Sequence, residues 1–183
     1  MTLREIRSNC GNLQSQPPRG SRVIERDLVK DKLPHLDQPA LKAITTQDPV
    51  EAESLKEAVY LSDQLIDELL LSDLLVNACP MWNFGIPSSL KAWIDHVVRA
   101  GKTFTYAGVA VEGLAKAILV LASGGVSEGP WKSWDSVEPY LRQILGFIGI
   151  DDVQTVRAEG MNIPPLGIHA LPNGEKAVEA LVI

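Results

Sequence analysis

Three large apolar side chains stand on a stretch of chain that cannot form regular structure. The segment 78–91 reads ACPMWNFGIPSSLK, and the two prolines and the glycine between 80 and 87 interrupt any helix or strand there. Met81, Trp82 and Phe84 therefore lie on a loop, where burial against other parts of the protein is least assured. A flat aromatic ligand stacked on this loop would cover them. The alternative, that Trp82 and Phe84 pack beneath the following helix, fits the loop alone equally well.

Asn83, at the centre of this loop, carries both a hydrogen-bond donor and an acceptor. It could bond the mixed polar edge of a ring-shaped ligand, or it could cap the turn. A helix is expected to follow, with Ser88 or Ser89 placed to cap it. The free N–H groups at the start of such a helix favour an electron-rich or anionic ligand.

A second loop consists of small residues. The apolar strand expected at 116–121 runs into Ala122, Ser123, Gly124 and Gly125. Glycines there let the backbone approach a ligand closely and present N–H groups without side-chain obstruction. An ordinary turn after a strand could have the same sequence. The motif therefore indicates a ligand site only because of its position relative to the first loop.

Strand-like and helix-like segments alternate along the chain, a pattern typical of a parallel sheet covered by helices on both faces. The expected strands are a short edge strand at 22–28 and inner strands at 74–79, 116–121 and 153–158. The expected helices are 51–72, 88–100, 134–148 and 175–181, with Pro139 near the start of the third or kinking it. A long surface loop is expected at 30–49, and Gly101 is placed for a left-handed cap after the second helix.

The two loops are expected to lie side by side. Strands 74–79 and 116–121 should be parallel neighbours joined by a right-handed crossover, so their carboxyl ends meet at one edge of the sheet. Open parallel sheets bind their ligands at this edge. The sequence therefore predicts that 81–84 and 122–125 form one ligand crevice.

Composition restricts the class of protein. The 183 residues fit a single domain, and 17 basic against 23 acidic residues give a net charge of -6, which disfavours nucleic acid as a partner. We expect no membrane span and no signal peptide, because no run of about 18 apolar residues occurs and the start of the chain is polar. Cys79 is expected in the core and unpaired with Cys10, which fits a reducing cytoplasm. The three scattered histidines predict no metal site.

The start of the chain departs from the α/β pattern. Only Leu3 and Ile6 could serve a central strand, and two charged residues stand between them. Residues 7–20 hold a single large apolar residue and a Pro-Pro pair, so no amphipathic helix is expected there. We therefore expect residues 1–20 to be poorly packed and the first strand to be degenerate or missing.

Several separated motifs resemble one enzyme family. Pro-Met-Trp-Asn-Phe at 80–84, followed by Ile-Pro-x-x-Leu-Lys-x-Trp-Ile-Asp at 86–95, is similar to the flavin-binding loop of FMN-dependent NADH:quinone oxidoreductases, also called azoreductases. The resemblance continues at 99–106, 116–130 and 139–149. It implies a flavodoxin-like α/β fold with a doubly wound parallel sheet, in a single domain over residues 1–183 that forms a homodimer.

The resemblance also implies an activity. Members of the family pass hydride from NADH or NADPH through bound FMN to quinones or aromatic azo compounds, in a ping-pong sequence over one face of the flavin. The chemistry takes place on the flavin, so no catalytic acid or base is required. Two alternatives stay open: a flavin-free relative with a structural or regulatory role in a dimer and, more remotely, a hydrolase, for which we expect no Gly-x-Ser-x-Gly elbow and no histidine placed to activate a serine.

Residue by residue, the resemblance places flavin-ring contacts on both loops and substrate contacts on two aromatic side chains. The implied cofactor-binding residues are Met81, Trp82, Asn83, Phe84, Ala122, Ser123, Gly124 and Gly125, and the implied substrate-pocket residues are Tyr106 and Trp131. Tyr106 could equally be a surface residue, and Trp134 is expected in the core. Ser123 stands where many members carry an arginine, which bears on nicotinamide preference.

The phosphate site of the family has no clear counterpart. In the family a serine-rich loop near the start of the chain holds the FMN phosphate, and here Ser8, Asn9, Gly11 and Ser15 match it poorly. Each lost charge-assisted hydrogen bond removes roughly 1.5–3 kcal/mol. We therefore expect weak phosphate binding and similar affinities for FMN and riboflavin.

Overall fold

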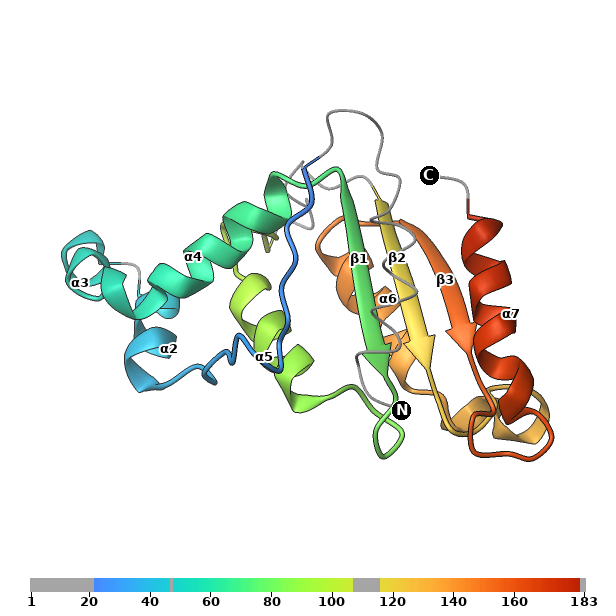
Figure 1. Cartoon of the computed structure of the whole chain (residues 1–183). Helices are drawn as coiled ribbons and strands as arrows, with labels where there is room; N and C mark the ends of the chain where they lie inside the picture. Colours follow the sequence, from blue (N-terminus) through green and yellow to red (C-terminus); the bar gives the residue numbers. More distant parts are fainter. Residues whose placement is uncertain (1–21, 47, 107–115, 182–183) are drawn as a thin grey trace.

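A computed structural model of the chain describes residues 22–46, 48–106 and 116–181. Three parallel strands, in the order β1-β2-β3, form the described sheet (Figure 1). They are β1 (Leu74–Pro80), β2 (Lys116–Ala122) and β3 (Asp152–Ala158). All three inner strands expected from the sequence are confirmed to within a residue at each end. The unusual features expected of residues 1–20 lie outside the described residues.

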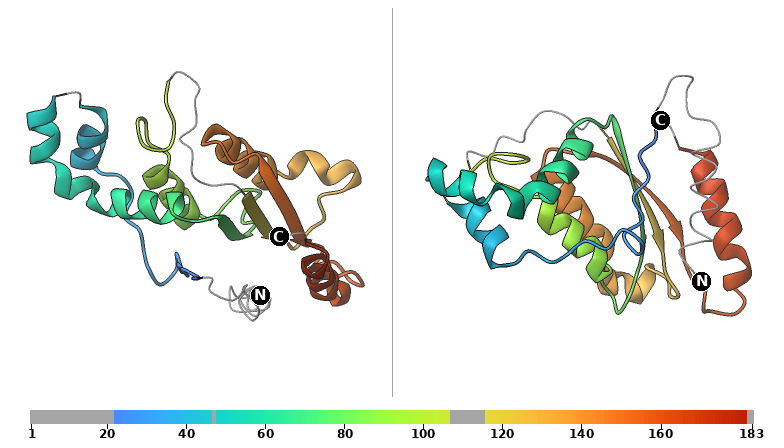
Figure 2. Two further views of the ribbon diagram at one scale, coloured as in Figure 1. Left: turned by 90° about the horizontal axis from the view of Figure 1, so that it is seen from above. Right: turned by 60° about the vertical axis from the view of Figure 1, so that its left-hand side comes forward.

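Helices cover both faces of this sheet (Figure 2). The α-helices are α2 (Gln38–Thr45), α3 (Pro49–Ser54), α4 (Lys56–Leu70), α5 (Ser88–Val97), α6 (Val137–Phe147) and α7 (Gly167–Glu179), and η1 (Gly129–Trp134) is a 3₁₀ helix. Alternate residues of each strand point to opposite faces. Leu119 and Leu121 face the main core with α4, α5 and α6, whereas Ile118 and Val120 lie on the opposite face, where α7 packs against β3.

Two expectations for the first third of the chain are wrong. Residues 22–28, whose side chains were expected to alternate between the two faces of an edge strand, form no strand, and β1 has a strand neighbour on one side only within the described sheet. Alternation alone does not supply the hydrogen-bonding partner that a strand requires. The segment 30–49, expected as a loop, contains α2, whose start is fixed because the Asp37 carboxylate accepts a hydrogen bond from the Ala40 N–H at 2.9 Å.

The expected helix boundaries need three corrections. The helix expected at 51–72 is broken at Leu55, which separates α3 from α4. Helix α5 starts after Pro87 and has no side-chain cap, so neither serine caps it. Helix α7 begins eight residues before the expected start at 175, although it includes Pro172 and Gly174. Gly174 lets α7 approach β3, because a Cβ there would lie 3.4 Å from the Cβ of Ala158.

Buried polar contacts fix α5 against α4. Arg99, just beyond α5, donates through Nη1 to Ser62 Oγ at 2.9 Å and to Asp63 Oδ1 at 2.8 Å. Thr103 Oγ1 donates to the carbonyl of Val97 at 2.7 Å, which closes the turn after the helix. The turn contains Gly101 in the left-handed conformation, at a φ of 74°, but α5 ends at Val97 with Val98 as its C-cap, so Gly101 does not cap the helix as expected. Helix α5 in turn holds the end of the loop that follows β1.

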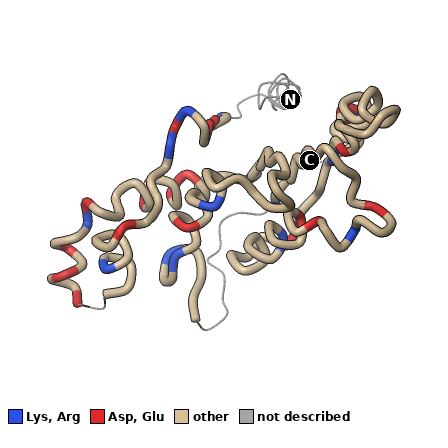
Figure 3. Tube along the Cα trace, turned by 90° about the horizontal axis from the view of Figure 1, so that it is seen from below, with Lys and Arg blue, Asp and Glu red and all other residues tan. Residues whose placement is uncertain are grey.

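Charges of both signs are interspersed along the described chain (Figure 3). Among the described helices, none combines the length and the apolar character that a bilayer span requires.

Candidate functional site

A tight turn at the end of β1 presents the aromatic residues. Trp82 and Gly85 exchange backbone hydrogen bonds of 2.9 and 3.0 Å, so Asn83 and Phe84 are the two central residues of a β-turn. Both have positive φ, 48° and 65°, as in a type I′ turn. Asparagine tolerates this conformation, whereas in phenylalanine the Cβ clash costs roughly 1–2 kcal/mol. Asn83 thus occupies a turn position, as one expectation held, and its side chain remains exposed.

The aromatic side chains of this turn are not buried beneath the next helix. Trp82 is 61% exposed and Phe84 is 56% exposed. The Phe84 ring contacts the edge of Trp134 with centroids 5.4 Å apart, and Trp134 contacts Trp131 at 4.7 Å. Trp134 is 51% exposed, so its expected place in the core is wrong: it belongs to a surface cluster of three rings. We call Phe84, Trp131 and Trp134 the aromatic cluster.

The second loop lies directly beside the first. Pro80 pairs with Ala122 in the parallel register, and the Met81 N–H donates to the Ala122 carbonyl at 2.8 Å. The predicted adjacency of 81–84 and 122–125 is therefore confirmed. On the other side the Ser123 N–H donates to the carbonyl of Ala158 on β3 at 3.0 Å.

The two glycines of this loop have different surroundings. A Cβ on Gly124 would lie 2.4 Å from the side-chain nitrogen of Asn162, so a side chain at this position would have to displace Asn162. A Cβ on Gly125 would meet no described atom within 4 Å. Open space in front of the Gly125 backbone is what a closely approaching ligand requires.

Backbone donors of both loops are available to a ligand. Within the described residues, the N–H groups of Asn83, Phe84, Gly124 and Gly125 donate no hydrogen bond. Two of them belong to the turn that carries the exposed rings of Trp82 and Phe84, and two belong to the loop hydrogen-bonded beside it. The arrangement suits a flat ring with polar acceptors along one edge.

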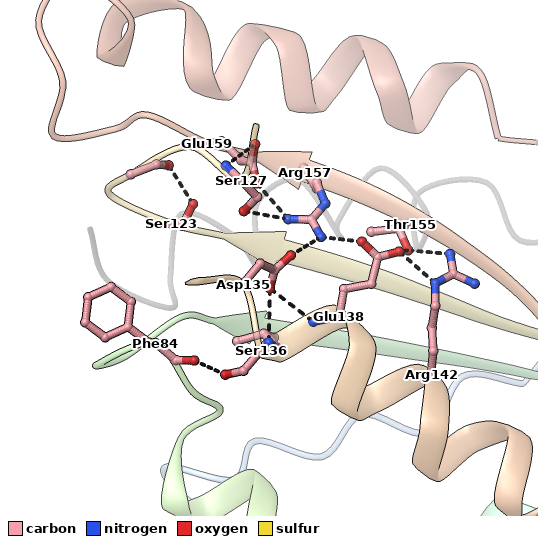
Figure 4. Close-up of polar contacts among 12 residues, drawn as sticks. Phe84, Ser123, Ser127, Asp135, Ser136, Glu138, Arg142, Thr155, Arg157 and Glu159 are labelled. Carbon is pink, nitrogen blue, oxygen red and sulfur yellow. Dashed lines mark hydrogen bonds and ion pairs between the residues drawn. The ribbon is translucent and has the colours of Figure 1, made fainter. Parts of the chain in front are cut away.

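Arg157 on β3 forms the centre of an ionic cluster behind the loops (Figure 4). Its Nη2 donates to Asp135 Oδ2 at 2.6 Å and to Glu138 Oε2, and its Nη1 donates to Glu159 Oε1 at 2.7 Å. Nη1 also donates to Ser127 Oγ at 3.1 Å. A small cavity between the loops and this cluster is lined by Cys79, Met81, Leu121, Ala122, Ser123, Asp135, Val137, Arg157 and Glu159.

Hydrogen bonds set the charge states in this cluster. Burial alone would raise the pKa of Glu138, but hydrogen bonds from Arg157, Arg142 and Thr155 outweigh it and lower that pKa to about 2. Burial alone would lower the pKa of Arg157, but bonds to three carboxylates raise it above its ordinary value. Burial raises the pKa of the Cys79 thiol to about 12, so this residue stays protonated and packs in the core as expected.

Tyr106 and Trp131, the expected substrate-pocket residues, lie in different places. Trp131 joins the first loop through Trp134. Tyr106 is 93% exposed and contacts Phe104, which contacts Phe147 on α6. The described contacts therefore bring Trp131, but not Tyr106, to the two loops.

The expectation that no Gly-x-Ser-x-Gly motif occurs is wrong, because segment 125–129 reads GVSEG and has the spacing of many hydrolase nucleophiles. Its serine, Ser127, accepts a hydrogen bond from Arg157 Nη1, and no described histidine contacts it. A cation in this position supplies no base to activate the hydroxyl. The structure therefore gives no support to a serine hydrolase.

Four residues of the site were missed by reasoning from the sequence: Arg157, Asp135, Ser136 and Asn162. Arg157 and Asn162 act across long sequence separations, which leave no local pattern. Asp135 did carry a signal, because an aspartate just before a helix commonly caps it. Its Oδ1 accepts from the Val137 N–H at 3.0 Å.

Known proteins of one kind match this chain over most of its length. A family described as having a flavodoxin-like fold matches residues 10–181. The FMN-dependent NADH:quinone oxidoreductase of Beijerinckia indica is 65% identical over 167 residues, which cover 89% of this chain and 83% of that protein. FMN-dependent NADH:quinone oxidoreductase 3 of Pseudomonas aeruginosa is 49% identical over 143 residues, 76% of this chain and 66% of that protein. Among solved structures, azoreductase AzrA superposes with a TM-score of 0.83 at 29% identity, over 98% of this chain and 91% of that one.

Glu138→Gln should make the protein less sensitive to acid. Because the folded-state pKa of Glu138 lies below its ordinary value of 4.5, its stabilising effect is full above pH 4.5 and is lost as the pH falls toward 2. Between these pH values the unfolding free energy of the native protein should fall more steeply than that of the variant, by on the order of 2 kcal/mol. Urea unfolding at a series of pH values measures how the unfolding free energy of the native protein and of the variant depends on pH. Glu175→Gln, at an exposed position on α7, is the control, and equal slopes for the native protein and Glu138→Gln would contradict the account.

Proposed function

Because the chain belongs to the family of FMN-dependent NADH:quinone oxidoreductases, with a flavodoxin-like fold, we propose that it passes hydride from NADH through FMN to quinone or azo acceptors. The observation that carries this proposal is the pairing of an exposed aromatic turn with a glycine loop at the carboxyl edge of a parallel sheet. This edge is where folds of this type bind nucleotides.

The residues present fit the isoalloxazine ring of FMN. The rings of Trp82 and Phe84 stand exposed beside four unused backbone N–H groups. Isoalloxazine offers a broad apolar face and an edge of nitrogens and carbonyls that accept such hydrogen bonds. The open space in front of Gly125 lets a ring lie against the backbone. These features support the assignment of 81–84 and 122–125 as the flavin-ring site.

When bound, FMN supplies the electron-transfer chemistry, and the chain positions it. Met81, Trp82 and Phe84 are proposed to cover the ring and exclude water from its edge. The N–H groups of Gly124 and Gly125 are proposed to hold its polar side, where hydrogen bonds stabilise added negative charge. Cys79 takes no part, because its thiol stays protonated and buried.

Trp131 is the better supported of the two substrate-pocket residues. It contacts Trp134, which contacts Phe84, so the aromatic cluster extends from the flavin-ring site toward solvent. A flat quinone or azo compound can stack on such a surface. We propose that donor and acceptor bind there in turn, in a ping-pong sequence. Tyr106 is proposed to line the substrate pocket only in the dimer, where a partner subunit completes that pocket.

A cytoplasmic homodimer is the proposed state of the protein. The rings of Tyr106, Trp131, Trp134 and Phe147 are all about half exposed or more. Trp131 and Trp134 belong to the aromatic cluster beside the site, whereas Tyr106 and Phe147 are joined through Phe104. Exposed apolar surface of this kind is typical of subunit interfaces. The proposed contact surface includes residues 88–100 and 131–148.

The two half-reactions test the proposed function. Protein incubated with FMN and freed of excess flavin should show the visible absorption bands of a flavoprotein. Anaerobic NADH should bleach these bands, and a quinone should restore them. A protein that stays colourless, or keeps its bands unchanged with NADH, would contradict the proposal and favour the flavin-free alternative.

Gly125→Ala should weaken flavin binding without loss of stability. The new methyl group would fill space that no described protein atom occupies, so it meets the ligand rather than the fold. We expect the FMN dissociation constant to rise at least about tenfold, the effect of losing one good contact. Flavin-fluorescence quenching measures the constant, and thermal unfolding without flavin measures stability.

Gly146→Ala on α6 is the matched control, because its new Cβ would make only an ordinary contact, 3.5 Å from Asp151 Oδ1. It should leave FMN affinity unchanged. Equal FMN affinity in the native protein and Gly125→Ala would place the flavin elsewhere.

Phe147→Asp should dissociate the dimer. Phe147 is 52% exposed on α6 within the proposed contact surface, where a buried carboxylate would be costly. Sedimentation velocity at micromolar concentration should show a dimer for the native protein and a monomer for the variant. Leu71→Asp is the control, because Leu71 is 83% exposed at the end of α4, outside that surface. A monomeric native protein at this concentration would refute the proposed assembly.

A further inference from the structure

Two polar contacts, linked by one step along the backbone, join strand β3 to the aromatic turn (Figure 4). Arg157 Nη2 donates to Asp135 Oδ2 at 2.6 Å. The other oxygen of Asp135 accepts from the N–H groups of Val137 and Glu138, at 3.0 and 3.3 Å, and so caps α6. Ser136, the next residue, donates through Oγ to the carbonyl of Phe84. Arg157 is thereby connected to the turn through Asp135 and Ser136.

Arg157 and Asp135 are both held firmly in place, as a connection that positions the turn requires. Arg157 is held by two further carboxylates, Glu138 and Glu159, so its guanidinium has little freedom. The Asp135 side chain is only 8% exposed. Charge-assisted bonds in such surroundings are stronger than ordinary ones and fix geometry as well.

Phe84 needs support from outside the turn. Its positive φ is unfavourable for a residue with a Cβ, and a strained conformation persists only where the surroundings determine it. Two contacts from one short segment supply that support: the Ser136 bond to its carbonyl and the edge of Trp134 against its ring. The position of that segment depends on the Asp135 cap.

We propose that Arg157 is a positioning residue for the flavin-ring site, and that it acts through Asp135 and Ser136 to hold the Phe84 ring in place. This inference rests on the proposed function for the identity of the ligand. Arg157 touches no reacting atom. Its role is to keep the strained turn in the one conformation that presents Phe84 beside the loop 122–125.

Three single variants, the double variant Ser136→Ala/Arg157→Met and one control variant test this connection. Ser136→Ala removes only the last bond, at an exposed position where folding is not at risk. Arg157→Met removes the first, and Arg157→Lys is the conservative variant. Arg142→Met is the matched control, because Arg142 bonds Glu138 and Thr155 in the same cluster but has no contact with Asp135. FMN affinity is measured by fluorescence quenching, and the aromatic cluster by near-ultraviolet circular dichroism without flavin.

Ser136→Ala and Arg157→Met should each raise the FMN dissociation constant about tenfold, because both act on the site through the Ser136 bond to Phe84 and losing one hydrogen bond costs up to about that much. The double variant should bind no more weakly than the weaker single variant, within about twofold, because both changes break one connection. Both single variants should alter the near-ultraviolet spectrum in the same way. Arg157→Lys should restore part of the affinity, and Arg142→Met should leave it within about twofold of the native value.

The proposal would be overturned if the double variant raised the FMN dissociation constant by the product of the two single effects. It would also be overturned if Arg142→Met and Arg157→Met lost FMN affinity equally, because Arg157 would then be a general stabiliser of the fold. Native affinity in Ser136→Ala would also overturn it. If the native protein binds no FMN, the proposed function fails. The near-ultraviolet spectra then still decide whether Arg157 and Ser136 act together on the Phe84–Trp134 pair.

Discussion

The parallel register of β1 and β2 is the constraint on which the site depends. It pairs Pro80 with Ala122, so both strands end at the same level and release their loops side by side. The hydrogen bond from Met81 to Ala122 extends this pairing one residue beyond the strand. Every other feature of the site, from the exposed rings to the unused N–H groups, is arranged around two loops that the sheet has already brought together.

Rigidity at this edge comes from polar contacts rather than from apolar burial. The aromatic cluster is about half exposed, so packing alone does not determine the conformation of Phe84. Polar contacts from β3 and the start of α6 reach the turn from behind, and the backbone of 123–125 is bonded to Ala158, Gly160 and Asn162. The four N–H groups proposed to face the flavin thus keep no partner among the described residues, which is the condition a site for a flat ring must satisfy.

Much of the fold could be predicted from the sequence because its signals are local. Inner parallel strands read as continuous apolar runs, and a strand followed by proline and glycine marks a loop. Helix α2 was not expected because Asp37 was not read as its cap, and α7 was expected to start too late because Pro172 and Gly174 read as breakers. The strand expected at 22–28 shows that an alternating pattern cannot reveal whether a neighbour exists.

Within the site, residue types predicted the two loops, and the resemblance to a family predicted the ligand. The connections between loops were beyond prediction, because Arg157 meets Asp135 across 22 residues and Ser136 meets Phe84 across 52. Trp134 was misplaced because a tryptophan at helical spacing reads as core, whereas here it stands on the 3₁₀ helix before α6. Tertiary contacts, which periodicity does not reveal, determine whether such a residue is buried or exposed.

Hydrogen exchange with and without FMN tests the central claim most directly, because it reports on the backbone groups proposed to bind the ring. The account predicts that saturating FMN slows exchange at the N–H groups of Asn83, Phe84, Gly124 and Gly125, while the amides of α7 keep their rates. If FMN binds and the exchange rates of both loops stay unchanged, the flavin ring lies elsewhere and the assignment of the site is wrong.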